Sequence, residues 1–324
     1  MFPSLNYDSP QDLRRFLDSR GLGMRKMYGQ NFLINRRARE QLLDALEIGP
    51  GDAVWEIGPG LGAMTAGLLE RGVAVTAFEI DKGFITALGE FFGTEPGFTL
   101  VEGDVLRTWN GVEGGDYLLG NLPYTIGAAL LADFIEKNRF FKRMVVTVQK
   151  EVARRMAARP GSDDYSSFSV LCGSAYRVTP LMVLKGASFY PEPRVDSQGV
   201  RLDLRVDVDP AAYPAFFKPL LRCLFSSRRK TVKNNLTSFI ASLNKGSEPR
   251  SAVAGKNDSP EIAREVLRIT GIPPNERAEQ LDIPDFVGLA ANLAKVMEKA
   301  NDATSPKAAS QSTERRTGGT YGNP

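Results

Sequence analysis

Residues 53–63, AVWEIGPGLGA, run from a short apolar stretch into a glycine-rich turn. The apolar stretch has the length of a buried strand, and residues 63–71 after the turn have helical spacing. Glycines let a backbone pass close to a ligand, and the first turn of a helix offers unpaired N–H groups. The stretch therefore predicts a strand–turn–helix unit of an α/β fold, with a ligand at the turn.

The same alternation continues on both sides of this unit. Helical spacing is found at 36–46, 82–92 and 126–137, and apolar strand-like runs at 73–80, 98–102, 117–119, 144–148, 176–184 and 199–206. Such alternation predicts a parallel sheet with helices on both faces. We expect the last two runs to close the sheet, the final one in antiparallel orientation.

The chain changes character after residue 209, where helical spacing recurs at 213–225, 229–243, 262–270 and 286–299. From residue 301 the sequence is polar and lacks apolar periodicity. We expect an N-terminal helix with a basic lead-in at 1–28, an α/β domain at 29–209, a small helical domain at 210–299 and a disordered tail at 300–324. Ser9, Pro10 and Gly21 mark the ends of the first helix.

Composition argues against several kinds of site. The 324 residues include no histidine and two cysteines, Cys172 and Cys223. Histidine-based triads are therefore excluded, and a disulfide scaffold or a zinc site is not expected, so we expect no metal. Because neither a long apolar run nor an apolar signal core is present, we expect a cytoplasmic protein without membrane contact.

Polar residues or glycines follow three successive predicted strands. Gly58 and Gly60 follow the first, Glu79 ends the second and Asp104 follows the third. A carboxylate at the second strand can accept both ribose hydroxyls, and ligands bind at this edge of open α/β sheets. Asp104 can accept an adenine amino group, or it can cap a short helix. The glycine pattern alone fits NAD nearly as well as S-adenosylmethionine.

The fourth strand ends in the tetrapeptide NLPY, residues 121–124. We expect the Asn121 amide oxygen and the Leu122 carbonyl to accept the two protons of an adenine N6 amino group, which turns its lone pair toward a methyl donor. The Tyr124 ring would stack on the base. The structural alternative is a strand-ending turn with a core tyrosine.

These motifs resemble those of the KsgA (RsmA) family of ribosomal RNA adenine dimethyltransferases. The resemblance covers roughly residues 22–295 and includes GQNFL at 29–33, NLPY, QKEV at 149–152, FYPEPRVDS at 189–197, RRKT at 228–231 and RAE at 277–279. Where the family commonly has Tyr-Gly-x-Leu-Ser-Val, this chain has YSSFSV at 165–170.

The resemblance implies a fold and a reaction. The fold is a Rossmann-like class I S-adenosylmethionine-dependent methyltransferase sheet, at 29–209, with a small C-terminal all-helical domain. The reaction is dimethylation of N6 on two adjacent adenines in a hairpin loop near the 3′ end of small-subunit ribosomal RNA. We expect a monomer that acts on an assembling 30S particle.

The resemblance also implies site residues. Tyr124 and Phe189 would sandwich the flipped adenine, beside Asn121 and Leu122. The cofactor would be bound by Asn31, Leu33, Gly58, Gly60, Glu79, Asp104 and Asn121.

Basic residues gather at 222–233, although the net charge is only +3. We expect Arg229 and Lys233 to share a helix face capped by Ser226 or Ser227. Charge alone fits a solvated helix equally well, and the resemblance favours contact with ribosomal RNA. The predicted RNA-binding residues are Arg222, Arg228, Arg229, Lys230 and Lys233, with a second patch at Arg14, Arg15, Arg25 and Lys26.

Four other functions are weighed. An Erm-type large-subunit rRNA adenine N6-methyltransferase is typically more basic and has isoleucine as the second residue of its Asn-x-Pro-Tyr motif. A DNA adenine methyltransferase more often has Asp-Pro-Pro-Tyr. A dehydrogenase needs a hydride-handling acid or base, which is not evident. A non-catalytic RNA-binding ribosome-assembly factor would not need the cofactor residues.

Overall fold

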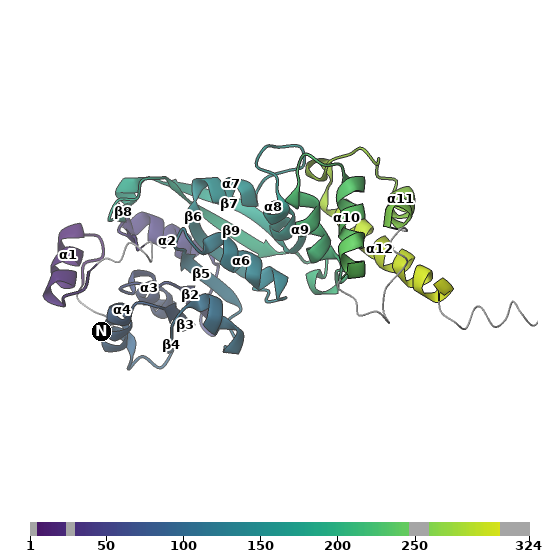
Figure 1. Ribbon diagram of the computed structural model, residues 1–324. Coiled ribbons are helices and arrows are strands. Elements are labelled where there is room, and N and C mark those ends of the chain that lie inside the picture. The colour runs from purple at the N-terminus through teal and green to yellow at the C-terminus, as the bar shows by residue number, and fades with distance from the viewer. Residues whose placement is uncertain (1–4, 24–29, 246–258, 305–324) are drawn as a thin grey trace, which may run out of the picture. The chain divides into compact units, whose positions relative to one another are not determined.

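The computed structural model describes residues 5–23, 30–245 and 259–304 (Figure 1). The chain divides into two compact units. The first contains residues 1–158 and 171–210, and the second contains residues 159–170 and 211–324. The second unit therefore includes a segment that the sequence assigned to the α/β domain.

A seven-stranded sheet forms the centre of the first unit, in the order β4-β3-β2-β5-β6-β9-β7. Five neighbouring strands, β4 to β6, are parallel, and β9 runs antiparallel to both β6 and β7. This confirms the Rossmann-like sheet and its antiparallel last strand. The strands are β2 (Ala53–Ile57), β3 (Ala74–Glu79), β4 (Phe98–Glu102), β5 (Tyr117–Asn121), β6 (Arg143–Gln149), β7 (Tyr176–Leu184) and β9 (Ser197–Leu204).

Side chains alternate between the two faces of the sheet along each strand. Both faces are buried, because helices cover each of them. On one face Val54 packs with Leu43 of α2 (Arg36–Ala45) and Leu68 of α3 (Ala63–Glu70). On the other face Trp55 packs against Phe134 of α6 (Gly127–Glu136). The other helices of this unit are α4 (Lys82–Phe92), α5 (Val105–Thr108) and α7 (Lys150–Met156), and α8 (Ser167–Ala175) continues into it from the second unit.

The N-terminal helix belongs to this unit rather than standing apart. In α1 (Pro10–Ser19) the side chain of Ser9 caps the helix by accepting a hydrogen bond from the Asp12 N–H, as the sequence predicted. Leu13 and Leu17 of this helix pack in a buried cluster with Leu61 and Phe84. The helix therefore lies against the part of the unit that holds the glycine turn.

Two very short strands form a second sheet that the sequence did not predict. Strand β1 (Phe32–Leu33) pairs antiparallel with β8 (Phe189–Tyr190), so that Phe32 faces Tyr190 and Leu33 faces Phe189. A pair of residues is too short to display the alternation by which strands are recognised. The pairing joins the GQNFL and FYPEP motifs, although Leu33 and Phe189 are 156 residues apart in the chain.

Four helices build most of the second unit: α9 (Phe217–Ser226), α10 (Val232–Lys245), α11 (Ser259–Thr270) and α12 (Ile283–Thr304). The inserted segment 159–170 is attached by Tyr165, whose hydroxyl donates to the Leu281 carbonyl at 2.9 Å and whose ring lies against Phe225. None of the helices in the described ranges combines the length and the apolar character that a membrane span requires.

Candidate functional site

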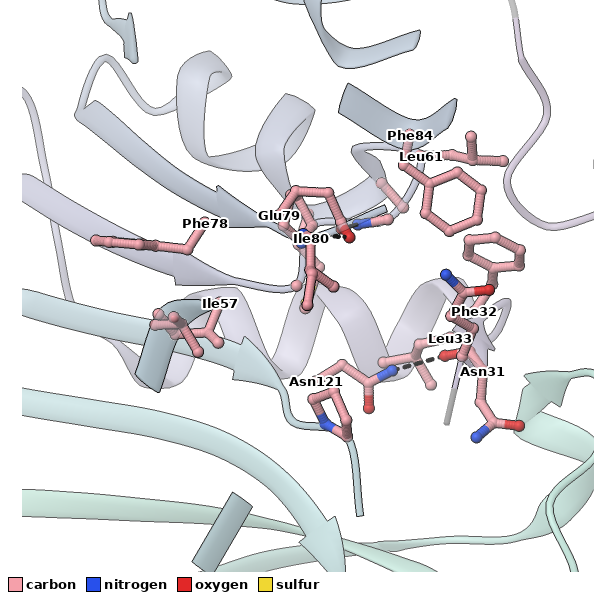
Figure 2. Close-up of a pocket in the computed structure, with 18 of the residues that line it drawn as sticks. Asn31, Phe32, Leu33, Ile57, Leu61, Phe78, Glu79, Ile80, Phe84 and Asn121 are labelled. Carbon is pink, nitrogen blue, oxygen red and sulfur yellow. Dashed lines mark hydrogen bonds between the residues drawn. The ribbon is translucent and has the colours of Figure 1, made fainter. Parts of the chain in front are cut away.

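One cavity opens at the carboxyl edge of β2, β3 and β5 in the first unit (Figure 2). The sequence predicted that seven residues would meet a cofactor, and all seven line this cavity: Asn31, Leu33, Gly58, Gly60, Glu79, Asp104 and Asn121. They come from five separate stretches of chain. The strand order brings them together, because the carboxyl ends of β2, β3, β4 and β5 lie at the same edge of the sheet.

The glycine turn exposes backbone to the cavity. Gly58, Gly60 and Gly62 have φ angles of 67°, 60° and 85°, in the left-handed region that favours glycine. A Cβ at Gly62 would lie 2.3 Å from a ring carbon of Phe92, whereas a Cβ at Gly58 would meet nothing within 4 Å. Gly62 is therefore required by packing, and Gly58 borders open space where a ligand can approach.

Glu79 is held rigidly at the end of β3. One carboxylate oxygen accepts hydrogen bonds from the backbone N–H groups of Ile80 and Asp81, both at 2.9 Å. The other accepts from the Gly60 N–H at 3.2 Å. Burial raises the pKa of Glu79 to about 7. The three backbone hydrogen bonds fix the side chain at the cavity wall, where its oxygens can accept hydrogen bonds from hydroxyl groups of a ligand.

Asp104 has the capping role that the sequence allowed, and it also lies at the cavity. Its Oδ1 accepts a hydrogen bond from the Leu106 N–H at 3.0 Å and caps the short helix α5. The same residue lines the cavity. A carboxylate with one oxygen used as a cap retains acceptor capacity on the other.

The side-chain amide of Asn121 has a fixed orientation. Its Nδ2 donates to the backbone carbonyl of Asn31 at 2.7 Å, and Figure 2 shows the amide oxygen turned away from this bond. The end of β5 is held by Leu122, whose side chain is buried and whose N–H donates to the Thr147 carbonyl at 3.0 Å. The strand end therefore presents a single amide acceptor.

Tyr124 and Phe189 have different surroundings. The hydroxyl groups of Tyr124 and Ser197 are hydrogen-bonded at 2.5 Å, and Tyr124 is half-buried. Phe189 is buried in the core with Leu33 and Leu184. Phe189 is 3% exposed, and Leu33, its partner in the pairing of β1 and β8, lies in the same cluster. In this structure Phe189 packs in the core, and its stacking on a base stays a prediction.

The cavity also has a wall that the sequence analysis missed. Tyr7, Leu13 and Arg39 line it, together with Gln30 and Phe32. Arg39 lies on the buried face of α2, one helical turn before Leu42 and Leu43. A charged residue at a position that helical spacing assigns to the core was the available signal.

The predicted RNA-binding residues lie in the second unit. Arg222 of α9 and Arg228, Arg229 and Lys230 of the following turn are exposed, and Lys233 of α10 is half-buried. The expected helix face is wrong, because Ser226 ends α9 and α10 begins only at Val232. Thr231 accepts from the Asn234 N–H at 3.3 Å in place of the predicted serine cap.

Several basic residues have acidic neighbours. Arg228 forms an ion pair with Glu279 at 3.1 Å. In the second predicted patch Arg14 and Arg15 pair with acids of their own helix, Asp18 and Asp12. Arg25 and Lys26 lie outside the described residues.

Comparison with known families finds one model that covers most of the chain. Residues 21–255 match the family described as "Ribosomal RNA adenine dimethylase". A protein of Treponema denticola named "Ribosomal RNA small subunit methyltransferase A" is 42% identical over 293 residues, which cover 88% of this chain and 94% of that protein. A protein of the same name from Borreliella afzelii is 40% identical over 238 residues, covering 73% and 84% of the two chains.

Solved structures agree on the fold. The crystal structure of a dimethyladenosine transferase from Plasmodium falciparum matches with a TM-score of 0.67 and 28% identity, covering 81% of this chain and 97% of that one. The 23S rRNA methyltransferase ErmE matches with a TM-score of 0.55 and 22% identity, covering 81% and 99%. The second likeness supports the fold alone.

Proposed function

The chain belongs to the ribosomal RNA adenine dimethylase family, and from this membership we propose that it dimethylates N6 of two adjacent adenines near the 3′ end of small-subunit ribosomal RNA. The proposal names S-adenosylmethionine as the methyl donor and a hairpin loop as the target. One observation carries it: Gly58, Glu79, Asp104 and Asn121 line a single cavity. The curated relatives named for the small subunit favour this target over the large-subunit alternative.

The cavity fits a nucleoside sulfonium. Glu79 would accept the ribose hydroxyls, Asp104 the adenine amino group, and the open space at Gly58 would admit the amino-acid end. Asn31 and Leu33 would form the opposite wall. When bound, S-adenosylmethionine supplies an electrophilic methyl group on its sulfonium.

Asn121 would orient the nucleophile. An exocyclic amine is a poor nucleophile because its lone pair is delocalised into the ring. Nδ2 is bonded to the Asn31 carbonyl, so Oδ1 is the atom available to accept a hydrogen bond from one N–H of the N6 amino group. The Leu122 carbonyl would accept a hydrogen bond from the other N–H. These bonds would favour a more pyramidal nitrogen in line with the methyl group, so catalysis would come from orientation. The ammonium product loses a proton readily, which suits a chain without histidine.

The target base must leave its stack to reach the cavity. Extrusion costs a few kcal/mol, which stacking on an aromatic ring offsets. Tyr124 would provide that ring, because its hydroxyl bond to Ser197 fixes its direction. A monomethylated amine has one N–H left, so either the Asn121 or the Leu122 bond must be expendable in the second round.

The exposed cations of the second unit would bind the RNA backbone. Charge on the α9–α10 turn supports this role, and the partner would be an assembling 30S particle. We extend the proposal to a cytoplasmic protein that acts as a monomer.

The direct test is methylation of immature small subunits with radiolabelled donor, followed by mapping of the modified bases. We expect two adjacent dimethylated adenines, and no product with Asn121→Ala or Glu79→Ala, both of which should remain folded. Label on large-subunit RNA alone would favour the Erm-type alternative. RNA binding without any label would favour a non-catalytic assembly factor.

A further inference from the structure

The cavity contains a cation that the proposed mechanism does not use. Arg39 lines the wall and is 8% exposed. Its Nη1 donates to the Leu33 carbonyl at 2.7 Å, and its Nη2 pairs with Asp8. A guanidinium has five N–H donors in a planar fork, so these two bonds leave donors for a further acceptor.

Arg39 lies near the glycine turn. The Tyr7 hydroxyl donates to the carbonyl of Leu61, a residue of that turn, at 2.8 Å. Burial raises the pKa of Tyr7 above its ordinary value, so its hydroxyl remains a donor. Tyr7, Arg39 and Leu61 all line the same cavity. Tyr7 and Leu13 precede residue 21, where the family match begins.

The charges along the cavity divide into two groups. Among the described residues that line it, the acids are Glu79 and Asp104, and Arg39 is the cation. Burying a cation is costly unless an anion meets it. Asp8 neutralises the buried guanidinium of Arg39 only in part, because the Asp8 side chain is 42% exposed to water while that of Arg39 is 9% exposed. The amino-acid end of the donor carries a carboxylate, which the fork of an arginine binds through two N–H groups.

We propose that Arg39 binds the α-carboxylate of the methyl donor and that the segment Tyr7–Leu13 completes this end of the site. The inference rests on the proposed function, because it takes the methyl donor as the ligand. Asp8 neutralises part of the Arg39 charge, and Tyr7 holds the segment against the glycine turn. The N-terminal segment is then part of the donor site.

The test compares two ligands by calorimetry: S-adenosylmethionine and its decarboxylated analogue, which keeps the sulfonium, the nucleoside and the amine. We expect wild-type protein to bind the analogue about 10- to 100-fold more weakly, the range of one charge-assisted bond pair. In Arg39→Gln, affinity for S-adenosylmethionine should fall by that factor, and affinity for the analogue should stay unchanged.

The matched control is Arg36→Gln, on the same helix, because Arg36 is exposed and paired with Glu40 at 2.9 Å. It should leave both affinities unchanged. Equal binding of the two ligands by wild-type protein would overturn the proposal without any variant. So would an equal loss for both ligands in Arg39→Gln, which indicates a structural role. Wild-type protein that binds neither ligand would instead refute the proposed function.

Discussion

At the scale of single residues, the first unit contains a carboxylate that is costly to ionise. Glu56 of β2 is fully buried, and one of its oxygens accepts the Thr65 hydroxyl at 2.6 Å. The other oxygen has no partner among the described residues. Burial raises the pKa of Glu56 to about 7, and the neighbouring charge of Glu79 adds to the rise.

This pKa predicts a pH-dependent stability. A carboxyl whose pKa is higher in the folded state stabilises the fold when protonated, and that contribution is lost as pH rises from about 4.5 to 7. Between pH 5 and pH 8, wild-type protein should lose about 2–3 kcal/mol of unfolding free energy that Glu56→Gln retains. Urea denaturation at the two pH values measures this. Glu102→Gln, an exposed control, should behave like wild type, and an equal loss in Glu56→Gln would contradict the prediction.

The bond between Tyr124 and Ser197 predicts a coupled effect on the reaction. Tyr124→Phe keeps the ring but loses the hydroxyl, and Ser197→Ala loses its partner. We expect each to lower kcat about 3- to 10-fold with little change in KM, because one hydrogen bond worth about 1 kcal/mol positions the ring.

The double variant should be no worse than either single variant, since both remove the same bond. Single-turnover methylation of small subunits provides the readout. Additive losses would mean that the two hydroxyl groups act independently.

At the scale of elements, the glycine turn predicts two different kinds of damage. Gly62→Ala should destabilise the fold by about 2–4 kcal/mol, because a left-handed φ and an overlap with Phe92 act together. Gly58→Ala should cost about 1 kcal/mol, from the backbone alone. Its methyl group would point into open space, so donor affinity should fall at least about tenfold. Urea denaturation and calorimetry separate the two outcomes, and equal destabilisation would contradict them.

The turn between α9 and α10 depends on one buried amide. Asn235 Nδ2 donates to the Leu224 carbonyl at 2.9 Å and to the Ser227 carbonyl at 3.3 Å. Asn235→Ala should lower the unfolding free energy by about 2–3 kcal/mol, since it removes both hydrogen bonds that the buried amide donates at the C-terminal end of α9. The neighbouring Asn234→Ala, at an exposed position, is the control and should change stability by less than about 0.5 kcal/mol.

The sequence predicted the elements whose patterns are local. The strand at Ala53–Ile57 and the helix at Lys82–Phe92 have the expected bounds, because burial imposes a period on each. The pair β1 and β8 was missed because it depends on a partner far along the chain. The start of α10 was misplaced, because Arg229 and Lys230 favour helices while Thr231 caps one.

The same distinction holds for the site. Strand-end residues such as Glu79 and Asp104 could be identified from order along the chain, since parallel strands end at one edge. Tyr7 could not, because its approach to the cavity depends on how the N-terminal segment packs. For Arg39 the sequence offered one signal, a charge at a core position of α2. The burial of Phe189 was missed for a related reason: it packs with Leu33, its partner in the pairing of β1 and β8, which lies far along the chain.

At the scale of the whole molecule, the donor cavity and the basic turn belong to different units, so their defects should separate. Arg229→Gln with Lys230→Gln should lower the slope of log affinity for RNA against log salt by about one to two and leave donor affinity unchanged. Glu79→Gln should lower donor affinity and leave the salt dependence of RNA affinity unchanged.

The control for the basic turn replaces Arg264 and Arg268 of α11 by Gln, since both are exposed and paired with acids. This pair removes the same charge from the same unit and should leave the slope near that of wild type. A similar drop in the control would mean that overall charge, not the turn, sets RNA affinity.

The excursion of residues 159–170 into the second unit has a consequence for biosynthesis. Tyr165 emerges from the ribosome 116 residues before Leu281, the residue that receives its hydroxyl. A nascent chain that has reached residue 210 contains every strand of the large sheet yet carries an aromatic ring whose partners have not been translated. A gene truncated after residue 210 would encode the entire donor cavity together with a loop that lacks its packing partners. A minimal catalytic half therefore requires that this loop be excised in addition to the truncation after residue 210.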